Sequence, residues 1–306
     1  MLRYALRRIA GIVPTLLILV TLSFFVIRLA PGGPFEGRVL TAQELANLDH
    51  LYGLDRPLAV QYLHYLEGLA HGDFGDSYQL RDQSVASLIA QGLPVSATVG
   101  FAALVLAILG GVPLGIWAAL RRAGAIDHAV TALATLAIAL PAFVTGPLLA
   151  LLFGLALRWL PVAGWQQGDP AYLVLPAVTL ALPVGAAIAR MLRGSLLETL
   201  GASFVRTARA RGLGPWRVLW RHALRPALLP VVSYLGPAAT YVFTGSLVVE
   251  TVFSLPGTGR YLVQGALDRD YTLVMAMVVL YGALTLLLNL AADLAYGWLD
   301  PRVRHD

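Results

Sequence analysis

The chain contains no cysteine and no lysine; all 22 of its Lys and Arg positions are arginine. Without cysteine there is no disulfide, no thiol catalysis and no cysteine-ligated metal. Without lysine there is no P-loop, because the lysine of that motif contacts the β- and γ-phosphates of the nucleotide. Schiff-base chemistry is excluded for the same reason. The chain is therefore not itself a Walker-type ATPase, and any energy it takes from ATP must come through another subunit.

Charged residues of either sign are also scarce. Of the 306 residues, 13% are charged and 58% are apolar, and the mean hydropathy is +0.72. This composition is typical of an integral membrane protein.

No catalytic set of residues is recognisable. The sequence has neither an HExxH pair for zinc nor a GxSxG nucleophile elbow. His71 and Asp73 lie close together, but two candidate ligands in a glycine turn are too few to indicate a metal site. We therefore expect neither a bound metal nor enzymatic activity.

Six apolar runs are long enough to cross a bilayer, which takes about 20 residues. They cover residues 9–27, 98–120, 129–157, 173–191, 230–253 and 273–298. The predicted fold is thus an all-α polytopic membrane protein with six transmembrane helices. Pro141 lies inside the third run, where a proline frees backbone carbonyls and marks either a structural kink or a break on a pathway.

The arginines are distributed unevenly between the two sides that six spans define. One side has 15, at positions 3, 7, 8, 121, 122, 190, 193, 206, 209, 211, 217, 221, 225, 302 and 304, and the other has 7, at positions 28, 38, 56, 81, 158, 260 and 269. Cytoplasmic loops carry the excess of positive charge, so we expect both termini in the cytoplasm. The first run is longer than the core of a signal peptide and is expected to be retained as a span.

Residues 31–94 form a stretch that is richer in carboxylates than in arginine. Loops poor in arginine belong outside. Thr41 and Glu44 have the spacing of a capping box, and a short helix over 84–91 is predicted to stop before Pro94. We therefore expect a helical extracytoplasmic insertion after the first span.

The most basic stretch, residues 197–230, carries six arginines against one carboxylate, Glu198. Its local signals predict two short helices joined by a glycine break. Ser203 is a suitable N-cap for the first helix. Gly212 suits the left-handed position just past the end of a helix, and Pro215 suits the first position of the next.

The second of these predicted helices has two faces. The apolar face consists of Trp216, Leu219, Trp220, Ala223 and Leu224, and the basic face of Arg217, Arg221 and Arg225. Two interpretations stay open: an ordinary cytoplasmic loop that holds anionic lipid, or a helix that docks a partner protein.

The order of residues here resembles a known family. The segments FVRTARARGL (204–213) and RHALRPALLP (221–230) are similar to the coupling loop of ABC-importer permeases, in the oligopeptide and dipeptide branch, and most of all in B-type subunits of the oligopeptide systems. Gly212 matches the central glycine of that loop. The general Glu-Ala-Ala opening is replaced by Arg206-Thr207-Ala208, a form that the peptide branch favours. Further similar segments lie at 24–35, 69–78, 245–257, 270–271 and 299–302.

The resemblance implies a type I ABC-importer permease, whose loop sits in a cleft of a cytoplasmic ATPase. The residues implied to couple to the ATPase are Ser203, Phe204, Arg206, Thr207, Ala208, Arg209, Ala210, Arg211, Gly212, Leu213 and Gly214. Those implied to support the loop are Trp216, Leu219, Trp220, His222 and Pro226.

Partners and location also follow from the resemblance. A complex of the family type joins this chain to a second similar permease, two ATPase chains that bind ATP and Mg, and an extracytoplasmic peptide-binding protein. It lies in the inner membrane of a bacterium, surrounded by lipid. The chain itself is then expected to hold no cofactor. Nucleic acid is not an expected partner, because the basic residues follow the membrane topology.

The expected substrate is an oligopeptide. The alternatives within the same family are import of a dipeptide, of nickel or of glutathione. An ion-driven secondary transporter is the alternative from a different class, and it would show a pseudo-repeat of discontinuous helices with charges near the midplane.

Four residues are candidates for the pathway or its gate: Pro141, Glu250, Pro256 and Asn289. Glu250 is the most costly of them to bury, and an ionisable group at that depth faces the helix bundle or a wet cavity. A structural partner and a gating role both explain it. By resemblance, the chain after the fifth span turns through a short re-entrant helix at the outer mouth.

The chain is accordingly expected to have four parts. These are the first span (1–30), the insertion (31–94), a five-helix permease core (95–299) that includes the coupling loop (197–229), and a cytoplasmic tail (300–306).

Overall fold

The computed structural model describes residues 2–36, 39–80 and 82–299. Within these ranges helices are the only regular elements, and the one strand-like contact is an isolated antiparallel bridge between Asp76 and Ser84. The all-α prediction is confirmed. The predicted tail, 300–306, lies outside the described residues.

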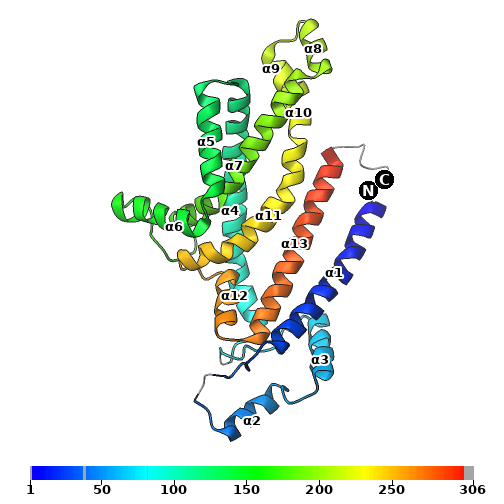
Figure 1. The fold of residues 1–306 in the computed structure, drawn as a ribbon, viewed down its shortest axis with the longest axis vertical. Helices are drawn as coiled ribbons and strands as arrows, with labels where there is room; N and C mark the ends of the chain where they lie inside the picture. The colour runs from blue at the N-terminus through cyan, green and yellow to red at the C-terminus, as the bar shows by residue number, and fades with distance from the viewer. Residues whose placement is uncertain (1, 37–38, 81, 300–306) are drawn as a thin grey trace.

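Five helices are long and apolar enough to cross a membrane. They are α1 (Leu2–Leu29), α4 (Val85–Leu120), α7 (Ala171–Gly201), α11 (Leu229–Val252) and α13 (Tyr271–Leu299) (Figure 1). They correspond to five of the six predicted apolar runs. The bent helix pair that follows α4 makes a sixth span if it crosses as one unit.

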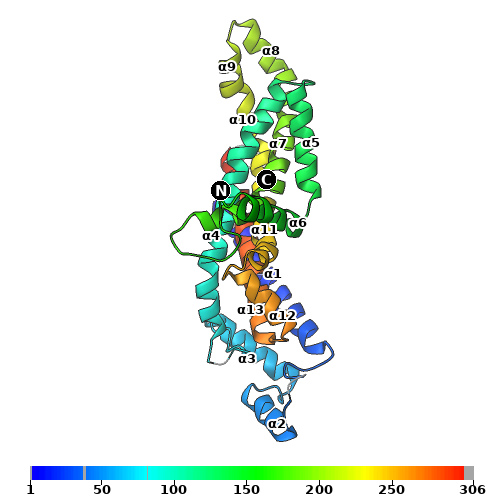
Figure 2. The ribbon, with the colours of Figure 1, turned by 90° about the vertical axis from the view of Figure 1, so that its left-hand side faces the viewer.

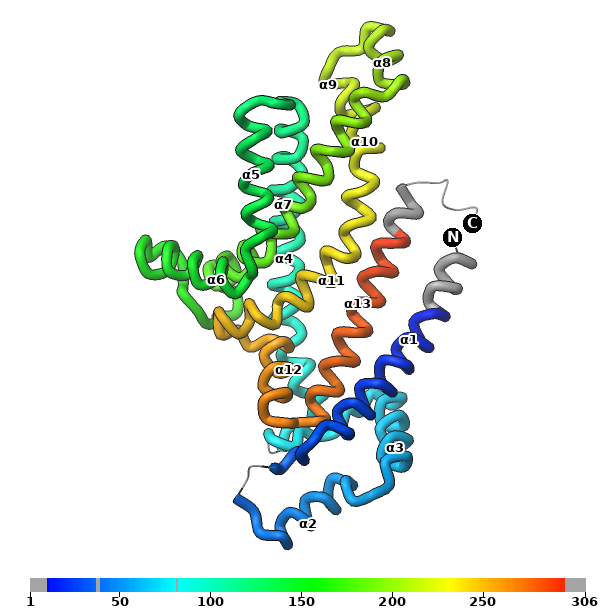
Figure 3. Tube along the Cα trace, in the orientation of Figure 1, coloured from blue at the N-terminus to red at the C-terminus, as the bar shows by residue number. Residues whose placement is uncertain are grey.

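That bent pair is the third predicted span, and it breaks at Pro141. α5 (Ala125–Ala139) ends just before this proline, and α6 (Ala142–Leu149), with its π-helical continuation η1 (Ala150–Ala156), leaves at 108°. Leu140 (ψ 120°) is extended, because a proline disfavours helical geometry in the residue before it, and Pro141 (ψ 150°) is extended as well. Figure 3 shows α6 turned sideways from α5. A role for Pro141 on a pathway stays a prediction.

α4 is one continuous helix of 36 residues, so the helix end predicted before Pro94 is wrong. The short helix predicted over 84–91 is the first part of α4. The glycine at 92, which lies inside α4, permits close packing, since a Cβ there would lie 2.9 Å from the backbone nitrogen of Thr258. The insertion therefore passes into the second span without a joint.

α4 and α7 form the centre of the molecule and approach each other closely. A Cβ on Gly111 would lie 2.5 Å from the carbonyl oxygen of Gly185, and one on Gly115 would lie 2.7 Å from that of Ala189. Small residues let two membrane helices bring their backbones together, where van der Waals packing holds them. α4 and α7 are thus a tightly packed pair.

The molecule is elongated, with the chain that follows α7 at one end and two helices of the insertion, α2 (Ala42–Leu51) and α3 (Leu58–Ala70), at the other (Figures 1 and 2). α1 packs along α13 and runs in the opposite direction. The start of α1 and the end of α13 therefore point toward the same end as the segment after α7.

The insertion is ordered by its own local contacts. In the predicted capping box, the Thr41 N–H donates to Glu44 Oε2 at 2.7 Å and the Glu44 N–H donates to Thr41 Oγ1 at 3.3 Å. The hydrogen bonds from the Thr41 backbone and hydroxyl lower the pKa of the Glu44 carboxyl. The rings of Tyr52 and Tyr78 lie 4.6 Å apart and join the end of α2 to the loop before α4.

Candidate functional site

The predicted coupling loop protrudes at one end of the molecule (Figures 1 and 2). It begins where α7 ends, with Ala202 as the one extended residue before α8 (Ser203–Ala210). After a glycine turn come α9 (Pro215–Val218), a π-helical turn η2 (Leu219–Ala223) and α10 (Leu224–Ala227). α11 then begins at Leu229. The loop therefore connects two membrane-length helices directly.

α8 buries one narrow face and exposes the rest. Val205 (0% exposed) and Ala208 (7% exposed) are its buried residues, three positions apart and hence on one side of the helix. Leu213 is half-buried. The other predicted coupling residues are all exposed: Ser203, Phe204, Arg206, Thr207, Arg209, Ala210, Arg211, Gly212 and Gly214. A partner chain could therefore reach most of the predicted set, but not Ala208.

The end of α8 is fixed by Gly212, as predicted. Its φ is +79°, in the left-handed region that glycine adopts without strain. The Gly212 N–H donates to the Arg209 carbonyl at 2.9 Å, and the Leu213 N–H donates to the Ala208 carbonyl at 3.3 Å. These two bonds are those of a Schellman motif, which satisfies carbonyls left free at a helix end.

The start of α8 differs from the prediction. Ala202, with ψ 154°, occupies the N-cap position, and no side chain caps the helix. Ser203 is the first helical residue, because α7 and α8 are separated by one extended residue only. The N-cap assigned to Ser203 is therefore wrong.

The second helical part begins with Pro215 at its first position, as predicted. Its apolar face is different from the prediction, because Trp216 (67%) and Trp220 (59%) are exposed whereas Leu219 (3%) is buried. The two indole rings stack on each other, with centroids 6.5 Å apart and 14° between their planes. The wider π-helical turn at η2 changes the register that a regular helix would give.

Two of the predicted supporting residues, Trp216 and Leu219, line a small hollow of about 260 Å³. Leu120 and Leu200, from the ends of α4 and α7, line it together with Arg209, Leu213 and Trp216. His222 and Pro226 are half-buried. All six arginines of the loop are exposed: Arg206, Arg209, Arg211, Arg217, Arg221 and Arg225. The tip of the molecule is thus strongly basic, with an exposed tryptophan pair next to the charge.

The opposite end of α11 carries the second candidate set, around Glu250. This carboxylate is fully buried, and its Oε2 accepts a hydrogen bond from the Gly259 N–H at 2.8 Å. Gly259 is the second residue of α12 (Thr258–Leu267). A carboxylate there satisfies a free N–H and interacts favourably with the positive end of the helix dipole. Glu250 therefore has a structural partner, and its gating role stays a prediction.

Two glycines make this contact possible. A Cβ on Gly257 would lie 2.3 Å from Glu250 Oε2, and a Cβ on Gly259 would lie 2.5 Å from the Cα of Leu247. A side chain at Gly257 would displace the Glu250 carboxylate, and one at Gly259 would push against the Leu247 backbone. α12 is therefore held against α11 by the hydrogen bond from the Gly259 N–H to Glu250 and by close contact between the Gly259 and Leu247 backbones.

α4 and α13 reach the same helix start. The Thr258 N–H donates to Ser96 Oγ at 2.9 Å, and Thr258 Oγ1 lies 3.1 Å from the hydroxyl of Tyr281. Three spans therefore meet at the start of the short helix that the resemblance placed at the outer mouth. Figure 3 shows α12 in the bend between α11 and α13.

The far end of α12 is joined to the insertion. Asp270 is fully buried; it accepts from the Ser77 hydroxyl and, at 3.1 Å, from the Leu273 N–H at the start of α13. The Tyr271 hydroxyl donates to the Gly32 carbonyl at 2.7 Å. The sequence showed Asp270 and Tyr271 only as part of a family-like segment, because partners 193 and 239 residues away leave no local pattern.

The remaining pathway candidates do not gather around Glu250. Asn289, half-buried on α13, packs against Gly236, which is 14 residues before Glu250 on α11, or about 21 Å along the helix. Pro256 is exposed in the turn between α11 and α12, and Pro141 is exposed at the start of α6. The structure therefore brings together Glu250 and the turn that contains Pro256, but not the whole predicted set.

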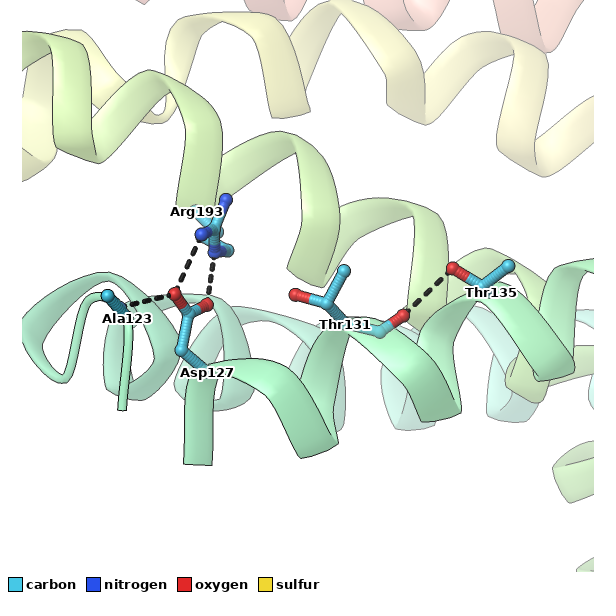
Figure 4. Close-up of polar contacts among 5 residues, drawn as sticks. All are labelled: Ala123, Asp127, Thr131, Thr135 and Arg193. Atoms are coloured by element: carbon cyan, nitrogen blue, oxygen red, sulfur yellow. Dashed lines mark hydrogen bonds and ion pairs between the residues drawn. The ribbon is translucent and has the colours of Figure 1, made fainter. Parts of the chain in front are cut away.

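Sequence reasoning also missed an ion pair near the coupling loop. Arg193 of α7 binds Asp127 of α5 through two nitrogen–oxygen contacts (Figure 4). In the sequence these two residues are charges next to two predicted spans, and no spacing or motif indicates that they form a pair. No group of three or more His, Cys, Asp or Glu side chains that could hold a metal occurs in the described part of the chain.

Two family models match the chain. Residues 111–305 match the inner membrane component of binding-protein-dependent transport systems. Residues 1–100 match the N-terminal part of the membrane component of the same systems. The coupling loop, Glu250 and α12 all fall within the first match.

Curated relatives agree over the full length. The oligopeptide transport system permease OppB of Salmonella typhimurium is 48% identical over all 306 residues, which are 100% of both chains. The dipeptide transport system permease DppB of Bacillus subtilis is 40% identical over 99% of this chain and 98% of its own.

Among solved structures, the inward-facing methionine ABC transporter MetNI has the same fold, with a TM-score of 0.60 at 20% identity over 70% of this chain and 96% of that one. The resemblance read from the coupling loop and the outer segments is thereby confirmed. The chain belongs to the inner membrane component family of binding-protein-dependent transport systems, as an ABC-importer permease that is similar to OppB over its full length.

Proposed function

We propose that this chain is the transmembrane permease subunit of an ATP-driven importer of oligopeptides. In this proposal it forms the translocation pathway together with a second, homologous permease. Two cytoplasmic ATPases bind ATP and Mg, and an extracytoplasmic binding protein delivers the peptide. The similarity to an oligopeptide permease over the whole of both chains supports the substrate class.

The exposed tip from Ser203 to Gly214 carries the coupling part of the proposal. Its fixed helix end at Gly212 and its row of exposed side chains offer a rigid, basic surface to a partner. Because Ala202 is the one extended residue between α7 and α8, a displacement of α8 would move the end of α7. Closure of the ATPases around bound ATP would thus change the packing of the spans.

The proposed orientation places both termini and the coupling loop in the cytoplasm, with the insertion outside an inner membrane. The excess of arginine at the loop end supports this orientation. The start of α1 and the end of α13, which point toward that end, also support it (Figure 1).

A dipeptide importer is the second candidate, because a dipeptide permease is 40% identical over nearly the full length. The two candidates differ in the length of the peptide that the binding protein delivers. The sequence favours the oligopeptide importer, because its identity to the oligopeptide permease, 48%, is higher than its identity to the dipeptide permease, 40%.

The test is to purify the tagged chain gently, identify the proteins that accompany it, and assay ATP hydrolysis in lipid nanodiscs. We expect a second permease and ATPase chains, with ATP turnover raised by the binding protein loaded with peptides of about three to five residues. Stimulation by dipeptides alone would select the second candidate. A chain that purifies alone and drives peptide uptake from an ion gradient in liposomes would contradict the proposal.

A further inference from the structure

α5 packs against α4 and α7 but leaves most of its own surface exposed within this chain. Of its 15 residues, Asp127 and Ala134 are the two that are buried. Large apolar side chains on it, such as Leu133 and Leu136, are more than half exposed. An apolar hollow of about 590 Å³ separates parts of α4, α5 and α7. Asp127 is therefore the one charged side chain among the two fully buried residues of α5.

Asp127 is held by three hydrogen bonds, as Figure 4 shows. Its two oxygens accept from Arg193 Nε and, at 2.7 Å, from Arg193 Nη2. Oδ2 also accepts the Ala123 N–H at 2.9 Å. Asp127 is 3% exposed and Arg193 29%. A bidentate arginine–carboxylate pair fixes both distance and orientation, so this contact sets how α5 sits against α7.

The same carboxylate fixes the turn between α4 and α5. Ala123 has φ +59°, a left-handed conformation that is costly for a residue with a Cβ. Its N–H is bound by Asp127, and the Gly124 N–H donates to the Arg121 carbonyl at 2.9 Å. One side chain thus joins the end of α4, the start of α5 and the last turns of α7.

The pair also lies close to the coupling loop. Arg193 is eight residues before Gly201, the end of α7, which is about 12 Å along the helix. α4 is expected to move together with α7, because the glycine contacts between these two helices leave no room between their backbones. α5 lacks such contacts, so it has the ion pair as its polar link to the helix that carries the loop.

We propose that Asp127 and Arg193 are positioning residues for energy coupling: their ion pair makes α5, and through it the broken span at Pro141, move together with α7 when the coupling loop is displaced. This inference rests on the proposed function. Without the pair, α7 would respond to the ATPases while α5 lagged behind, so ATP would be hydrolysed with less transport.

The first test compares single and double alanine variants of the assembled complex. Asp127→Ala alone or Arg193→Ala alone leaves one charge without its partner, which is destabilising in itself. The double variant removes the tie and leaves neither charge unpaired. Arg190→Ala is the matched control, because Arg190 lies on the same helix one turn earlier and is exposed. The readout is the number of peptides transported per ATP hydrolysed.

We expect the double variant to assemble and to hydrolyse ATP at the basal rate, while its transport per ATP falls roughly 2- to 30-fold, the usual range for residues that link two sites. Arg190→Ala should keep the wild-type ratio. A double variant with the wild-type ratio would overturn the inference, because relief of the unpaired charge would then have restored everything.

A covalent substitute provides the second test and covers variants that assemble poorly. The chain has no cysteine, so Asp127→Cys with Arg193→Cys can be joined by a cleavable bifunctional thiol reagent. We expect the linked form to recover the transport ratio and to lose it again on reduction. Equal ratios before and after reduction would overturn the inference. Should the wild-type complex itself show no peptide-dependent ATP hydrolysis, the proposed function would fail instead, which keeps the two claims separate.

Discussion

Gly212 and Gly257 are glycines for different physical reasons. Gly212 has φ +79°, and a Cβ built on it would meet no atom within 4 Å. Glycine is required at this position by the backbone conformation and not by crowding within this chain. At Gly257 the reverse holds, because a Cβ would lie 2.3 Å from Glu250 Oε2. A substitution at Gly212 therefore tests the partner surface, whereas one at Gly257 tests the internal packing.

Gly212→Trp is expected to abolish peptide transport without preventing membrane insertion. The side chain has room in this chain, so its bulk acts on whatever docks against α8. Gly212→Asn is the matched control, since asparagine tolerates the left-handed conformation and the change costs about 1 kcal/mol or less. The measurement is peptide uptake by cells that express each variant at equal level.

Normal uptake by Gly212→Trp would contradict the assignment of this loop to the ATPase contact. Equal loss in both variants would show that the helix end, and not the contact, is what the glycine protects.

At the scale of elements, the sequence predicted most of what is encoded locally, with the N-cap assigned to Ser203 as an exception. The capping box at Thr41, the helix end at Gly212 and the restart at Pro215 each depend on residues within one or two turns, and each is present. The predicted end of a helix before Pro94 failed, because glycine and proline stop a helix in water but are tolerated where other helices pack around it.

The contacts that sequence reasoning missed join distant parts of the chain. Asp127 and Arg193 are 66 residues apart, and Ser77 and Asp270 are 193 apart. No periodicity or motif pairs such residues. The exposure of Trp216 and Trp220 was missed for another reason. It depends on a π-helical turn, which residue propensities do not predict.

The hold of Glu250 on α12 can be tested at the scale of that element. Glu250→Ala removes the acceptor for the Gly259 N–H, and a buried donor without a partner costs about 1–3 kcal/mol. Leu255, fully buried in the turn between α11 and α12, can report this as a cysteine. We expect a small thiol reagent to label Leu255→Cys roughly 5- to 150-fold faster when Glu250→Ala is also present.

Glu250→Gln is the control for that experiment, because its amide oxygen can still accept the Gly259 N–H. It should label nearly as slowly as the parent. Fast labelling in Glu250→Gln and Glu250→Ala alike would mean that the negative charge, and not the hydrogen bond, holds α12.

At the scale of the whole molecule, α11 links the two candidate sites. It begins at Leu229, right after the coupling loop, and Glu250 lies near its other end. Its 24 residues cover about 36 Å, which is enough to cross the roughly 30 Å core of a bilayer. The exposed basic tip and the buried network around α12 are therefore at opposite ends of one helix, and the insertion is attached to the second of them through Asp270.

This arrangement makes a definite prediction for the orientation in the membrane. Gln43, on α2, and Ser203, on α8, are both exposed and lie at opposite ends of the molecule (Figure 1). The chain has no cysteine, so a single introduced thiol is labelled without background. In intact cells whose outer membrane admits the reagent, an impermeant maleimide should label Gln43→Cys and leave Ser203→Cys unlabelled until the inner membrane is permeabilised. The reverse pattern would place the basic tip outside, away from ATP, and the coupling role of Gly212 would fall with it.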